Sequence, residues 1–226
     1  MILHLVTDRR RLCGENAPRE SARRGLLEQV AFAVDAGVDV VQVREQDLSA
    51  SDLLGLVRDA VALTIGSKTH VVVNDRLDVA LAAGAHGVHL KSSSMAPADV
   101  KRIVPQGFLV GRSVHSLEEV GAAAGAIDYA IAGTVWPSRS KPDGHACLGV
   151  DGLAAIAASA GAPTLAIGGV SVTRMAEIAR AGCAGAAAIQ LFMAAAAAGT
   201  GACRVQPLVS VVSEARRMFD TARVPS

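Results

Sequence analysis

Two arginines, two lysines and an aspartate stand where apolar runs of this sequence end, and together they could bind an anion. In the stretch VQVREQDLSA, residues 41–50, a strand-like run passes directly into Arg44 and further polar residues. Arg112 lies at the end of the run FLVGRSV, Lys91 and Lys141 follow other apolar runs, and Asp75 ends the run HVVVND. Cations attract phosphate groups, and Asp75 could ligate a Mg²⁺ ion that bridges a diphosphate, because this ion is usually held by one or two carboxylates and phosphate oxygens.

Further groups suited to phosphate binding follow the same kind of run. Gly168 and Gly169, in IGGV, permit close approach of the backbone just before an expected helix, and helix N-termini favour anions. The run AAIQLF, which contains Gln190, leads into a second expected helix start. The other polar candidates at run ends are Thr7, Asp8, Gln42, Asn74, His89, Ser113, His115, Thr134, Ser138 and Ser140.

Short β-branched runs alternate with amphipathic, Ala- and Leu-rich stretches along the whole chain. Apolar strands separated by helices predict a parallel sheet covered on both faces. The eight expected strands are LHLVTD, VDVVQVR, HVVVND, GVHL, FLVGRSV, YAIAGTV, PTLAIGGV and GAAAIQLF. The expected helices cover residues 22–36, 51–63, 77–83, 97–104, 117–124, 150–159, 172–181 and 205–222.

Eight such units in a chain of 226 residues predict a single α/β domain, a (β/α)₈ TIM barrel over residues 1–226. The alternative is an open doubly wound sheet, but no GxGxxG follows the first run, which weakens its nucleotide-binding version. Barrel active sites form at the carboxyl ends of the strands, so the polar groups above would meet at one mouth. Taken singly, Asn74 and Asp75 could be a turn, and His115 could cap the helix that begins near Ser116.

Composition excludes several classes of function. The net charge is +1 and no basic run with interleaved aromatics occurs, which argues against a nucleic-acid partner. The run AAIQLFMAAAAAG is short and Ala-rich, so we expect no membrane span. The four cysteines (Cys13, Cys147, Cys183 and Cys203) lack metal-binding spacing and are interpreted as reduced thiols of a cytoplasmic protein.

Seven segments carry a resemblance to a known family: VTD, QVRE, VNDR, AAGAHGVHL, GRSVHS, DYAIAGTVWPSRSKPDG and AIGGV. In this order they resemble thiamine phosphate synthase and its relative TenI, the thiazole tautomerase, over residues 3–192. The resemblance implies a (β/α)₈ barrel, in agreement with the strand count. It also implies small phosphorylated thiazole and pyrimidine substrates as partners. The oligomeric state is left open, with a homo-oligomer among the alternatives.

The synthase comparison implies roles for particular residues and shows two departures. Gln42 and Arg44 match a Gln-x-Arg-x-Lys diphosphate motif whose lysine is replaced here by Gln46. Asp75 matches a Mg²⁺ ligand, whereas Ser94 stands at the second Mg²⁺ aspartate, and Lys91 could supply part of the missing charge. The other matches are Asn74, Ser113, the loop residues Ser138, Ser140 and Lys141, and the thiazole-phosphate glycines Gly168 and Gly169.

The TenI comparison rests on GRSVHSLEE and also shows a departure. The catalytic histidine of the tautomerase follows the glycine of the sixth strand, but here Thr134 follows Gly133. Proton transfer would then fall to His115 or an ordered water. The preferred hypothesis is a TenI-like thiazole tautomerase, an isomerase without a cofactor. The alternatives are a Mg²⁺-dependent thiamine phosphate synthase, a transferase, and a non-catalytic binder of thiazole or thiamine phosphates.

Two substitutions follow from this hypothesis. Gly169→Val is expected to weaken thiazole-phosphate binding and to leave the fold largely intact. The double change Gln46→Lys and Ser94→Asp is expected to raise Mg²⁺-dependent thiamine phosphate synthesis, most clearly when Lys91→Gly is added.

Overall fold

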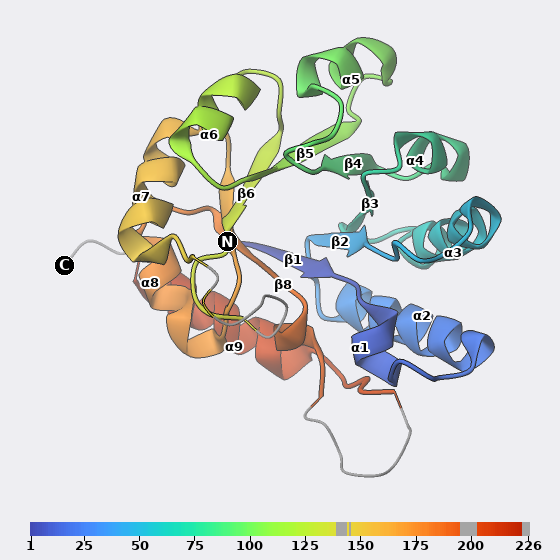
Figure 1. Ribbon diagram of the computed structural model, residues 1–226. Coiled ribbons are helices and arrows are strands. Elements are labelled where there is room, and N and C mark those ends of the chain that lie inside the picture. Colours follow the sequence, from blue (N-terminus) through green and yellow to red (C-terminus); the bar gives the residue numbers. More distant parts are fainter. Residues whose placement is uncertain (139–143, 145, 195–202, 223–226) are drawn as a thin grey trace.

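The computed structural model describes residues 1–138, 144, 146–194 and 203–222, and its strands form a closed parallel barrel (Figure 1). Each strand pairs in parallel with the next, and β8 pairs with β1 to close the barrel. All eight expected strands are therefore confirmed. The strands are β1 (Ile2–Val6), β2 (Val40–Val43), β3 (His70–Asn74), β4 (Gly87–Leu90), β5 (Leu109–Val114), β6 (Tyr129–Gly133), β7 (Thr164–Ile167) and β8 (Gly185–Ala188).

Helices surround the barrel, and the expected ones are confirmed with shifts of a few residues at their ends. Their bounds are α2 (Arg19–Asp35), α3 (Ala50–Leu63), α4 (Leu77–Ala83), α5 (Pro97–Ile103), α6 (Leu117–Ala123), α7 (Gly149–Ser159), α8 (Met175–Arg180) and α9 (Val209–Thr221). Two 3₁₀ turns, η1 (Val172–Arg174) and η2 (Gln190–Phe192), follow β7 and β8. The sequence did not predict α1 (Arg9–Cys13), a single basic turn after β1 that is too short to show an apolar period.

The two faces of each strand serve different cores. On β1, Leu3 and Leu5 belong to the large core between the sheet and the helices, whereas Val6 belongs to a small cluster inside the barrel. Tyr129 enters the barrel interior because Gly111 leaves room for it: a Cβ at Gly111 would lie 2.0 Å from the tyrosine ring. The barrel interior is thus filled by side chains rather than hollow, and the free space lies at its mouth.

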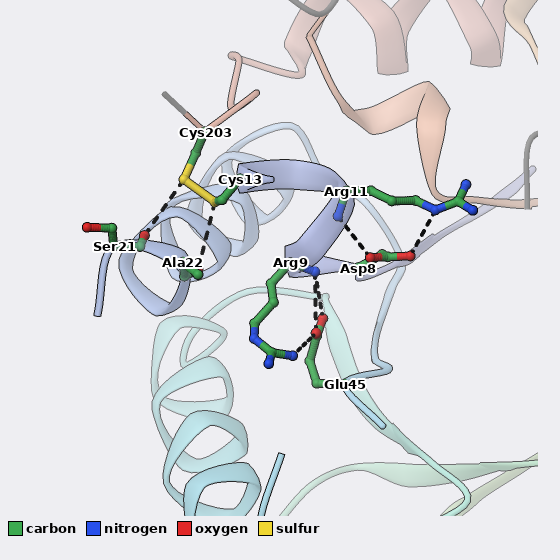
Figure 2. Close-up of a disulfide and its surroundings, with 8 residues drawn as sticks. All are labelled: Asp8, Arg9, Arg11, Cys13, Ser21, Ala22, Glu45 and Cys203. Atoms are coloured by element: carbon green, nitrogen blue, oxygen red, sulfur yellow. Dashed lines mark hydrogen bonds and ion pairs between the residues drawn. A yellow bond between two sulfur atoms is a disulfide. The ribbon is translucent and has the colours of Figure 1, made fainter. Parts of the chain in front are cut away.

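The interpretation of all four cysteines as reduced thiols is wrong for two of them. Cys13 at the end of α1 and Cys203 form a disulfide that spans 190 residues of sequence (Figure 2). The backbone brings them together, because Arg204 N donates to Leu12 O at 2.7 Å. The spacing of the cysteines along the sequence does not indicate a contact that depends on closure of the barrel.

Among the described residues, no helix is long and apolar enough to cross a membrane.

Candidate active site

A cavity of about 430 Å³ opens at the carboxyl ends of the strands, where the sequence predicted the site. Strand order explains the assembly, since neighbouring parallel strands deliver their last residues to the same rim. Eight predicted residues line this cavity: Gln42, Arg44, Asn74, Lys91, Ser113, His115, Thr134 and Gly168. Gln46, at the expected lysine position, lines it too.

A second pocket of about 220 Å³ adjoins the cavity after β7 and β8. Its lining includes the predicted residues Ser138, Gly168, Gly169 and Gln190. Arg11, which the sequence analysis missed, lines both the pocket and the cavity, as do Ile167, Gly168 and Ile189. The two spaces are therefore contiguous. The predicted residues Ser140 and Lys141 lie outside the described residues.

The glycine pair is required by the backbone as well as by the pocket. Gly168 and Gly169 have φ values of 94° and 65°, where side chains are rarely tolerated. A Cβ at Gly169 would lie 2.8 Å from the carbonyl oxygen of Pro137 and 2.8 Å from Cβ of Trp136. Valine at 169 would therefore strain the turn and displace the neighbouring loop, so Gly169→Val would disturb the pocket as a whole and not the phosphate contact alone.

Asp75 is held in place at the end of β3 by its backbone and by two side chains. Its φ of 64° is unusual for a residue other than glycine, although aspartate tolerates this region better than most. Its Oδ2 accepts from the ammonium of Lys91 at 2.5 Å, and its Oδ1 accepts from the hydroxyl of Ser94. Burial on its own raises the pKa of Asp75, but the bonds from Lys91 and Ser94 and the lysine charge together lower it.

These contacts do not fit a Mg²⁺ site. Mg²⁺ in proteins is commonly held by one or two carboxylates in near-octahedral geometry. Asp75 already uses both of its oxygens within the protein, and Ser94 stands where the synthase comparison places the second carboxylate. Across the described part of the chain, no group of three or more His, Cys, Asp or Glu side chains is arranged to hold a metal ion.

His115 lies in the cavity rather than only at a helix start. Ser116 is the residue that caps α6, accepting from Glu119 N at 3.2 Å. The Nδ1 of His115 contacts the carbonyl oxygen of Gly133, the residue before Thr134. A carbonyl only accepts, so Nδ1 is the donor in this contact, and Nε2 is the ring nitrogen left to interact with a substrate.

Two buried histidines hold residues of the cavity floor. His4 Nε2 donates to Gln42 Oε1 at 3.0 Å, and Gln42 Nε2 donates to Asn74 Oδ1 at 2.9 Å. His89 Nε2 lies 2.9 Å from Ser113 Oγ. Burial lowers the pKa of both His4 and His89 to about 3, so both rings are neutral near pH 7. The sequence placed His89 among the polar residues expected at the mouth but did not predict its bond to Ser113, and it gave no indication of His4, because a single histidine inside an apolar run carries no distinctive pattern.

The side chains that bind the polar residues after β2, in the stretch VQVREQDLSA, come from the start of the chain. Thr7 Oγ1 accepts from Arg44 N at 3.0 Å and donates to Glu45 Oε1 at 2.7 Å. Arg9 of α1 donates to Glu45 at 2.9 Å and to Asp47 at 2.6 Å; Figure 2 shows its bonds to Glu45. This network fixes the loop after β2 and thereby the backbone of Arg44 at the cavity rim.

Comparison with known proteins finds relatives over most of the chain. Residues 5–192 match the family model described as thiamine monophosphate synthase. A protein of Clostridium botulinum (strain Loch Maree / Type A3) named thiamine-phosphate synthase is 34% identical over 192 residues, covering 84% of this chain and 89% of its own. One of Methanoculleus marisnigri with the same name is 39% identical over 159 residues, or 70% of this chain and 75% of its own.

A solved structure extends the similarity to the fold. The thiamine phosphate pyrophosphorylase of Pyrococcus furiosus superposes with a TM-score of 0.75 at 29% identity, covering 98% of this chain and 96% of that one. The resemblance seen in the seven sequence segments is thereby confirmed, and the chain belongs to the thiamine monophosphate synthase family.

Proposed function

We propose that this protein is a thiamine phosphate synthase, which joins hydroxymethylpyrimidine diphosphate to thiazole phosphate. The names of its relatives support this transferase activity over the tautomerase that the sequence analysis preferred. The departures at Gln46, Ser94 and Thr134 favoured the tautomerase, but relatives at 34–39% identity bear the name of the synthase.

The observation that carries the proposal is the pair of adjoining spaces at the mouth. The larger cavity has Arg44 and Lys91 on its wall, and the smaller pocket has Gly168 and Gly169 with Arg11 between the two. A synthase must bind a diphosphate and a monophosphate side by side, whereas a tautomerase needs a single phosphate site. Two contiguous anion-binding spaces therefore suit the two-substrate reaction better.

The reaction breaks the bond between the pyrimidine methylene carbon and the diphosphate oxygen. Diphosphate leaves with the bonding electron pair, and the lone pair of the thiazole nitrogen forms the new bond to carbon. Charge grows on the leaving oxygen as its bond to carbon breaks, so preorganised cations and donors there lower the barrier. We assign this role to Arg44 and Lys91, with Gln42, Asn74 and Ser113 binding the pyrimidine diphosphate.

The remaining roles concern the second substrate. The backbone at Gly168 and Gly169, with Arg11, Ser138 and Gln190 around it, would bind the thiazole phosphate. Thr134 and the preceding Gly133 line the larger cavity. The sequence predicts that Ser140 binds substrate and that Lys141 is catalytic, and both roles stay predictions.

The test is turnover of the purified protein with both substrates, with thiamine phosphate and released diphosphate measured together. The proposal expects the two products in equal amounts, and it expects Arg44→Met to lower the rate by about a hundredfold, as removal of a transition-state charge does. The proposal would be contradicted by diphosphate release without formation of thiamine phosphate. It would also be contradicted by a protein that binds thiazole phosphate tightly but shows no turnover. The second outcome would support the non-catalytic binder.

One observation keeps the tautomerase as a second candidate. Because Nδ1 of His115 contacts the Gly133 carbonyl, Nε2 is left for proton transfer, in a cavity where the family tautomerase uses a histidine one residue after Gly133. An assay of thiazole aromatisation with wild type and His115→Gln separates the two activities. This candidate expects aromatisation that the variant loses, whereas the synthase proposal expects none in either protein.

A further inference from the structure

Lys91 and Asp75 meet because they follow neighbouring strands. Asn74 of β3 is in register with His89 of β4, so the residues just beyond these two positions lie at the same level of the mouth. Lys91 Nζ lies 2.5 Å from Asp75 Oδ2, and the lysine side chain keeps 44% of its surface exposed. The ammonium is therefore anchored by the carboxylate and still accessible from the cavity that Arg44 lines.

A turn completes the anchoring. Ser94 N donates to Lys91 O at 3.1 Å, and Lys91 N donates to Ser94 Oγ at 2.9 Å. The Ser94 hydroxyl then donates to Asp75 Oδ1. Both carboxylate oxygens of Asp75 are thus engaged by groups of one short turn, and a metal ion would have to compete with the ammonium for Oδ2 and with the Ser94 hydroxyl for Oδ1.

The net charge of Lys91, Asp75 and Ser94 together is nevertheless the same as that of a divalent metal ion held by two carboxylates. A divalent cation with two carboxylates has no net charge, and neither has one ammonium with one carboxylate beside a neutral serine. An ammonium carries three N–H donors. Asp75 occupies one, which leaves others that can point at phosphate oxygens in the cavity.

We propose that the Lys91 ammonium, anchored by Asp75 and the Ser94 turn, binds the diphosphate of the pyrimidine substrate in place of a metal ion. This inference rests on the proposed function for the identity of the substrate, but the binding itself does not depend on turnover. It assigns a metal-independent diphosphate site to this chain, built from residues where the family comparison implies Mg²⁺.

The first experiment measures binding of inorganic pyrophosphate by calorimetry, with EDTA and then with Mg²⁺, at matched concentrations of free pyrophosphate. Wild type is expected to bind in EDTA with an affinity that Mg²⁺ does not improve. Lys91→Met is expected to weaken binding in EDTA by about tenfold or more, because it removes a charged hydrogen-bond donor. Lys68→Met is the control, since Lys68 is exposed before β3, at the opposite end of the barrel.

A second variant tests the same idea in the opposite direction. Lys91→Gly combined with Ser94→Asp removes the ammonium and supplies a second carboxylate, and an aspartate at 94 can accept from the backbone N–H of residue 91 as serine does. This variant is expected to bind pyrophosphate only when Mg²⁺ is present. Circular dichroism shows whether this double variant folds. If it does not, the Lys91→Met variant alone tests the metal-independent site.

The outcomes separate this inference from the proposed function. Wild-type binding that requires Mg²⁺, or Lys91→Met that binds as well as wild type in EDTA, would overturn the metal-independent site, whatever the turnover assay gives. Metal-independent binding that Lys91→Met loses would support the site, even in a protein that forms no thiamine phosphate.

Discussion

The rings of His4 and His89 meet edge to face inside the barrel, with centroids 6.3 Å apart and planes inclined by 74°. Tyr129 lies against both, stacked on His89 at 5.6 Å and tilted toward His4 at 5.5 Å. All three side chains are almost fully buried directly below the cavity. The floor of the candidate active site is therefore a neutral aromatic layer whose two imidazoles orient Gln42 and Ser113.

This burial predicts acid sensitivity. The pKa of each histidine falls from 6.5 to about 3 on folding, mainly through burial. Between these values the unfolded chain binds protons that the folded protein does not, so the free energy of unfolding decreases as pH falls, by about 1.4 kcal/mol per pH unit for each histidine. Urea unfolding of wild type and His4→Gln from pH 7 to pH 4 gives the free energy of unfolding of each protein. The difference between the two curves isolates His4, because the other titrating groups contribute equally to both. Parallel curves for the two proteins would show that His4 does not titrate in this way.

The fold could be predicted because its signal is local. Each strand is a run of Val, Ile or Ala whose length and spacing are visible in the sequence, and the barrel then places every strand end at one mouth. Arg44, Lys91 and Gly168 were found in this way. The contacts His4–Gln42 and Cys13–Cys203 join residues that only the closed barrel brings together, and nothing in their sequence neighbourhoods indicates them.

Arg9 is expected to matter more for stability than other arginines in ion pairs. Glu45 is only 5% exposed, and burial raises its pKa against the lowering effect of its bonds to Thr7 and Arg9. Arg9→Met would leave this carboxylate buried without its cation, at a cost of about 3 kcal/mol. Arg19→Met, which removes an exposed pair with Asp52, should cost less than about 1 kcal/mol. Chemical unfolding at pH 7 compares them, and equal losses would mean that the Arg9 network contributes no more than a surface pair.

Thiol counting tests the disulfide. Oxidised protein is expected to show two reactive thiols after denaturation, from Cys147 and Cys183, and four after reduction. Before denaturation only the exposed Cys147 should react quickly, since Cys183 is buried and burial raises its pKa to about 12. Reduction should also lower the unfolding temperature, because the bond closes a loop of 190 residues, worth about 5 kcal/mol in the chain-entropy account. Four thiols in the denatured, unreduced protein would restore the interpretation from the sequence.

Arg11 is expected to contribute to phosphate binding, although no motif pointed to it. It lines both mouth spaces and pairs with Asp8 at 3.2 Å, the residue that caps α1 (Figure 2). Arg11→Met should weaken thiazole-phosphate affinity by about tenfold, the value of one charged hydrogen bond. Arg10→Met is the matched control, because the neighbouring Arg10 is exposed and pairs with Glu15. Equal affinities for the two variants would remove Arg11 from the site.

Gln46 offers a gain-of-function test of the diphosphate side. It is exposed at the rim and lines the cavity together with Lys91 and Asn74. Gln46→Lys adds a second mobile cation where charge accumulates on the leaving diphosphate, whereas Gln46→Met adds a chain of similar length without charge. The lysine variant should form thiamine phosphate about tenfold faster at saturating substrates, which corresponds to about 1.4 kcal/mol of the barrier. Thiazole-phosphate affinity should not change, because that phosphate is expected beside Gly168, across the mouth.

If Lys91 already neutralises the leaving group as proposed, the gain should appear equally in EDTA and in Mg²⁺. A gain confined to Mg²⁺ would instead show that a metal ion takes part in binding the diphosphate beside the introduced ammonium, and no gain in either condition would mean that glutamine at 46 costs the reaction nothing.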